Sequence, residues 1–66
     1  MNIEKQLRLG MAFKEVRNQK AMAKISGLHE VSVSNWMRGK DASMPAIEKI
    51  AKALGYSVVE FLALGE

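Results

Sequence analysis

Three glycines, each placed directly after a stretch of helically spaced apolar residues, divide this sequence into short segments. They are Gly27, Gly39 and Gly55. Glycine ends a helix readily because it adopts the left-handed backbone conformation without a steric penalty. Throughout the chain apolar residues recur every three or four positions. The period-2 alternation of a strand occurs only over residues 31–34. We therefore expect an all-α chain of short helices.

Capping residues define five expected helices more closely. Asn18 can accept from the free amides of a following helix, and Ser57 with Glu60 three residues later is typical of a capping box. The expected ranges are Ile3 to Arg17 with Asn2 as cap, Gln19 to Ser26, Glu30 to Arg38, Met44 to Leu54 with Ser43 as cap and Pro45 in the first turn, and Val58 to Leu64.

Apolar stripes on the first and fourth of these helices predict core side chains. Gly10 in the middle of the first stripe costs about 1 kcal/mol relative to alanine, which indicates a bend or a close contact there. The stripes consist of Ile3, Leu7, Leu9, Ala12, Phe13 and Val16 on the first helix, and of Met44, Ile47, Ile50, Ala51 and Leu54 on the fourth.

Length and composition exclude several classes of protein. The 66 residues predict one domain spanning 1–66, with a core small enough that help from a second copy is plausible. Cysteine is absent and there is one histidine, so neither disulfides nor the usual zinc sites can form. No carboxylate pair suggests acid and base catalysis. We expect no enzyme activity, cofactor, metal or small-molecule ligand.

The distribution of charge indicates a polyanionic partner. Residues 14–40 carry six basic side chains and two acidic ones, which leaves a net charge of +4, while residues 41–66 carry two basic and four acidic ones, which leaves −2.

No apolar run approaches the roughly 18 residues of a membrane span, and the first residues lack the order of a signal peptide. These features predict a cytoplasmic protein that does not contact membranes.

The most informative stretch is residues 19–38. A small residue lets a second helix cross close by, a glycine makes the sharp turn, and three apolar residues form the inner side of the second helix. Two helices that cross steeply at a short glycine turn form a helix-turn-helix motif. In chain order these positions are Gln19, Ala23, Gly27, Leu28, Val33 and Trp36, with Gly39 after the second helix.

The run AMAKISGLHEVSVSNWMRGK, followed by IEKIAKALGYSVVEFL, resembles the helix-turn-helix domain of the phage Cro and CI repressors, the XRE family, over residues 12 to 64. The resemblance implies a compact five-helix, lambda-repressor-like domain whose third helix enters the major groove of double-stranded DNA. His29, Met37 and Ala42 depart from the family pattern, at the start and the end of the third helix and in the turn that follows it.

The resemblance also implies roles for individual residues. The implied base-edge contacts are Glu30, Val31, Ser34 and Asn35, with Ser34 closest to the backbone. The implied phosphate contacts are Asn18, Gln19, Lys20, Ser32, Arg38 and Lys40.

The chemistry of these side chains agrees with base recognition. Asparagine can pair with adenine, valine can pack on a thymine methyl group, and a carboxylate can accept from cytosine. Other interpretations stay open: Glu30 can simply stabilise the helix dipole, the basic residues of the second helix can form a solvated face, and Trp36 is better explained as a core residue than as a base-stacking one.

The sequence therefore predicts a transcriptional regulator, most simply a Cro-like phage or prophage repressor. One copy reads few base pairs, so we expect a homodimer on a pseudo-palindrome with half-sites about 34 Å apart. The alternatives are an antitoxin-type protein and a protein-interaction module with the same fold. Surplus apolar residues in the last helix suggest the dimer interface, namely Val58, Val59, Phe61, Leu62 and Leu64.

Overall fold

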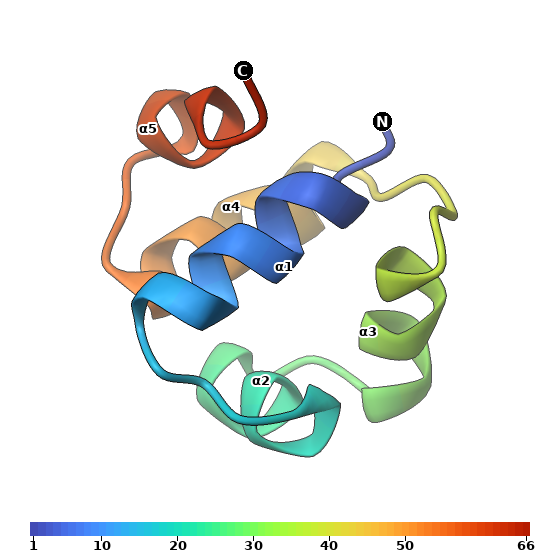
Figure 1. Ribbon diagram of the computed structural model, residues 1–66. Helices are drawn as coiled ribbons and strands as arrows, with labels where there is room; N and C mark the ends of the chain where they lie inside the picture. Colours follow the sequence, from blue (N-terminus) through green and yellow to red (C-terminus); the bar gives the residue numbers. More distant parts are fainter.

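Five short helices follow one another along the chain in the computed structural model, which describes residues 1–66 (Figure 1). There is no strand, only an isolated β-bridge between Asn2 and Asp41. The all-α class and the number of helices are as predicted. The helices are α1 (Glu4–Phe13), α2 (Gln19–Ser26), α3 (Glu30–Met37), α4 (Met44–Leu54) and α5 (Val58–Ala63).

Two of the predicted caps form with good geometry. Asn18 Oδ1 accepts from the backbone N–H of Ala21 at 2.8 Å and begins α2. At α5, the Ser57 hydroxyl accepts from the Glu60 amide at 3.1 Å, and Glu60 Oε1 accepts from the Ser57 amide at 2.9 Å. Ser43 precedes α4 without a side-chain cap bond. Ile3 rather than Asn2 is the cap residue of α1, although Asn2 Oδ1 accepts from the Glu4 amide at 3.0 Å.

The predicted end of the first helix at Arg17 is wrong by four residues. Helix α1 ends at Phe13, and Glu15 adopts a left-handed conformation with φ of 57°. The Val16 amide then donates to the Met11 carbonyl at 2.9 Å. This turn satisfies a carbonyl that the helix end would otherwise leave without a partner, and it lets Asn18 begin α2.

The predicted apolar stripe of α1 is corrected as well. Leu7 and Met11 are buried, whereas Phe13 is 64% exposed and Ala12 is also exposed. At 100° per residue, Phe13 lies about 120° around the helix from Leu7, so the two cannot share a face. Met44 is 49% exposed instead of joining the core, because it is the first residue of α4 and lies at its edge.

The core draws on all five helices. Figure 1 shows α1 crossing the middle of the molecule in front of α4, with α2 at the bottom, α3 on the right and α5 at the upper left. A Cβ atom placed on Gly10 would lie 2.9 Å from Leu54 Cδ1, which explains the glycine as a close helix crossing. The largest fully buried side chains are Phe61, Ile3, Leu7, Met22, Ile47, Ile50 and Val33.

None of the five helices combines the length and the apolar character needed to cross a membrane.

Candidate nucleic-acid interface

Helices α2 and α3 are joined by a short turn built on Gly27. Its φ of 72° and ψ of 18° are left-handed, and the Leu28 amide after it donates to the Ala23 carbonyl at 3.1 Å. Ala23 is 8% exposed at the crossing, where a larger side chain would hold the helices apart. The glycine and the alanine therefore have the structural roles that the sequence predicted, and the arrangement is a helix-turn-helix.

One side of α3 anchors it to the body of the protein. Val33 is fully buried, and Trp36 is half-buried and packs against the core. The interpretation of Trp36 as a core residue is therefore confirmed. Because α3 uses this side for packing, its opposite side is left to solvent.

The outward side of α3 and the start of α2 present the residues for which the sequence implied DNA contacts. Val31 is 71% exposed and takes no part in the core. The exposed members of the set are Asn18, Lys20, Glu30, Val31, Arg38 and Lys40, and the half-buried members are Gln19, Ser32, Ser34 and Asn35.

Two shallow depressions connect these side chains into one surface. The smaller, of about 300 Å³, is lined by Gln19, Glu30, Val31, Ser34 and Arg38. The larger, of about 500 Å³, is lined by Arg17, Asn18, Gln19, Lys20 and Glu30 together with Met11 and Met37. Gln19 and Glu30 border both, so the start of α2 and the start of α3 form a continuous face.

The cations on this face form no ion pair within the protein. Only Arg8 among the basic side chains has a carboxylate oxygen within 4.0 Å, that of Glu4. Arg17, Lys20, Arg38 and Lys40 are exposed and lack such a partner. Their charge is available to phosphates, and neutralising phosphates is the main source of affinity for DNA.

Three of the implied DNA-contacting side chains already make hydrogen bonds. Asn18 uses Oδ1 to cap α2, which leaves its Nδ2 hydrogens free to donate. Arg38 Nη2 donates to Asn35 Oδ1 at 3.0 Å, which links an implied phosphate contact to an implied base contact.

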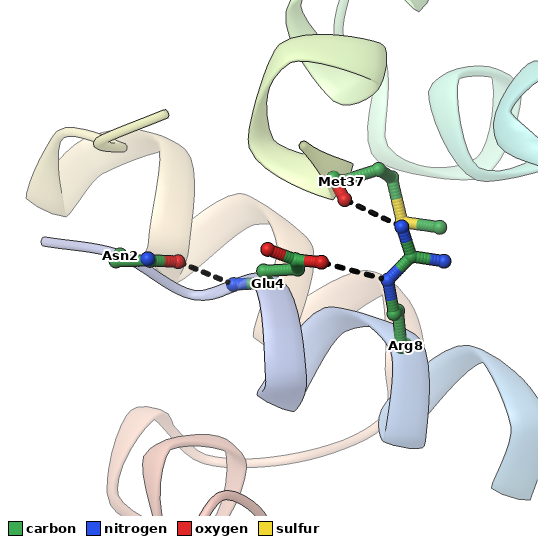
Figure 2. Close-up of polar contacts among 4 residues, drawn as sticks. All are labelled: Asn2, Glu4, Arg8 and Met37. Atoms are coloured by element: carbon green, nitrogen blue, oxygen red, sulfur yellow. Dashed lines mark hydrogen bonds and ion pairs between the residues drawn. The ribbon is translucent and has the colours of Figure 1, made fainter. Parts of the chain in front are cut away.

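Sequence analysis did not single out Arg8, which holds the end of α3. Its Nη2 donates to the Met37 carbonyl at 2.7 Å, and its Nε donates to Glu4 Oε2 at 3.2 Å (Figure 2). The same figure shows Asn2 holding the Glu4 amide, so these contacts form a chain from the first residues to the last turn of α3. The four-residue spacing of Glu4 and Arg8 could have suggested their pairing, but no local signal indicates Met37.

The structure corrects one residue of the expected dimer interface. Phe61 is fully buried in the core of its own chain and cannot meet a second copy. Val58, Leu62 and Leu64 are half-buried and pack against that core. Val59 is 79% exposed and is the apolar side chain of α5 that points most clearly to solvent.

Comparison with known proteins agrees with this geometry. A helix-turn-helix family model matches residues 13–61, most of the chain. Searches of curated proteins and of solved structures found no significant match. The fold defines a helix-turn-helix protein. The chain belongs to the helix-turn-helix family of the XRE, or Cro/CI, type, and it is a DNA-binding regulator of that type.

Proposed function

We propose that this protein is a sequence-specific transcriptional repressor of the Cro-like phage or prophage kind, which binds a pseudo-palindromic operator as a homodimer. The observation that supports this most directly is the outward face of α3. It combines exposed or half-buried side chains that packing does not require with Arg38 and Lys40, which have no carboxylate partner in the protein.

In this proposal α3 lies in the major groove, with its first residues against base edges. Val31 contacts a thymine methyl group, Glu30 accepts from cytosine, and Asn35 reads a purine. Ser34 lies beside these readers, nearer to the backbone. The phosphate contacts come from Asn18, Gln19, Lys20, Ser32, Arg38 and Lys40.

A second copy supplies the specificity that one copy lacks. Two recognition helices about 34 Å apart reach successive major grooves on one side of the duplex. The exposed Val59 supports placing the contact between copies at α5, with the half-buried Val58, Leu62 and Leu64 beside it. A core shared by all five helices supports the view that residues 1–66 act as one domain.

Selection of bound duplexes from a random library tests the proposal. We expect enrichment of a sequence with two inverted half-sites whose centres are one helical turn apart. Gel shifts on the enriched duplex should persist in excess competitor DNA. If no sequence is enriched and no competitor-resistant band forms, the proposal is wrong, and the interaction-module interpretation of the fold gains support.

A further inference from the structure

Arg38 and Asn35 form a hydrogen-bonded pair on the DNA-facing side of the last turn of α3. Arg38 Nη2 lies 3.0 Å from Asn35 Oδ1, and both side chains reach solvent. Residues three apart on a helix lie on the same face, so the pair forms without distortion. No carboxylate lies within 4.0 Å of the guanidinium to draw it away.

The contact fixes the orientation of the asparagine amide. A guanidinium group has five N–H donors and no acceptor, so only the oxygen of the amide can face it. The Nδ2 hydrogens of Asn35 are then turned away from Arg38. Without the arginine, the amide could rotate and present either its donors or its acceptor to a ligand.

We infer that Arg38 determines which bases Asn35 accepts, in addition to any contact of its own with phosphate. This inference rests on the proposed function. With Oδ1 held by Arg38, Asn35 offers mainly N–H donors to the groove. Such donors match the N7 acceptor of a purine and the O6 of guanine, but they oppose the amino groups of cytosine and of adenine. Arg38 is thus a positioning residue for a base reader.

If Arg38 contacted only phosphate, replacing it would have a different effect on DNA binding. A lost phosphate contact weakens binding to all sequences by a similar factor, whereas a lost reader changes the preference at one position. The four donors of Arg38 that Asn35 does not use leave room for both roles. Base-resolved affinities therefore separate the two.

The experiment measures Arg38→Ala on four duplexes that differ at one base pair. That base pair is the position of the enriched operator at which Asn35→Ala abolishes preference. Lys40→Ala serves as the matched control, because it removes one exposed positive charge two residues away, where no side-chain hydrogen bond to Asn35 exists. Unfolding curves of the three variants verify that each is folded.

We expect Arg38→Ala to weaken binding and to reduce the discrimination at that position from about tenfold or more to about twofold. Lys40→Ala should weaken binding to all four duplexes equally. In the free protein, ¹⁵N relaxation of Asn35 Nδ2 should show greater mobility in Arg38→Ala than in the wild type. Equal losses on all four duplexes, or unchanged Nδ2 mobility, would overturn the inference. Failure of the wild-type protein to discriminate among any duplexes would instead overturn the proposed function.

Discussion

Arg8 of α1 donates a hydrogen bond to the backbone carbonyl of Met37, the last residue of α3, across 2.7 Å. Carbonyls at a helix end lack intrahelical donors and carry the negative end of the helix dipole. A guanidinium placed there satisfies one of them and is attracted by the others. The bond also connects α1 to the turn that carries Arg38 and Lys40, so it fixes the position of this end of α3, which the proposed function places on DNA.

Arg8→Ala should therefore lower both the stability and the DNA affinity of the protein. The arginine side chain is 54% exposed, so we expect a loss of about 1 kcal/mol or less in the free energy of unfolding. The affinity for the operator should fall by less than tenfold, the factor that corresponds to 1.4 kcal/mol. Urea unfolding and titration of labelled duplex measure the two quantities.

Lys5→Ala is the matched control for Arg8. It removes one positive charge from the same helix, and Lys5 is exposed and has no carboxylate partner. If both variants lose affinity equally, the effect comes from net charge and not from the bond to Met37.

The difference between Asn18 and Arg8 shows how much of the molecule could be predicted. Asn18, Gly27 and the pair Ser57 and Glu60 act within four residues of their own positions, and the structure has each of them in the expected place. Arg8 contacts a residue 29 positions away. Such a contact depends on how the helices pack, and a local sequence pattern does not predict that packing.

The errors have the same physical origin. The apolar pattern of α1 continues to Val16, but tertiary packing selects Leu7 and Met11 and leaves Phe13 outside. The surplus of apolar residues in α5 is visible in the sequence. Of these residues the protein buries Phe61 fully in its own core. This burial depends on how α1 packs against α5. The outward side of α3 could be predicted because Val33 and Trp36 fix the inward one.

The capping box of α5 makes stability depend on pH. Hydrogen bonds from the backbone and the hydroxyl of Ser57 lower the pKa of Glu60 below its ordinary value of 4.5. The folded state then binds fewer protons than the unfolded state, so the stabilisation is complete above the unfolded pKa and is lost as the pH falls through the folded one. Glu60→Gln should remove this dependence. Thermal unfolding of both proteins at a series of acidic pH values measures it, and parallel curves would contradict the assignment.

Val59 provides the test of dimerisation. A charge at this 79% exposed position should disrupt contact between copies and leave the fold intact, so Val59→Asp should sediment as a monomer where the wild type sediments as a dimer. An unchanged mass would exclude α5 as the interface.

Phe61→Ala, by contrast, should cost about 3–5 kcal/mol of stability because it creates a cavity. In a chain this small, that loss should unfold most of the protein, as circular dichroism would show.

The salt dependence of binding counts the phosphate contacts. If each copy neutralises about four phosphates, the plot of log affinity against log salt concentration should have a slope of about −7 for the dimer. Lys40→Ala removes one contact from each copy and should reduce the magnitude of the slope by about 2, on operator and random duplexes alike. Lys49→Ala removes the same charge from the exposed side of α4, which is not among the implied DNA contacts, and should leave the slope unchanged. Equal changes in both variants would show that the slope reports the net charge of the protein and not a contact made by Lys40.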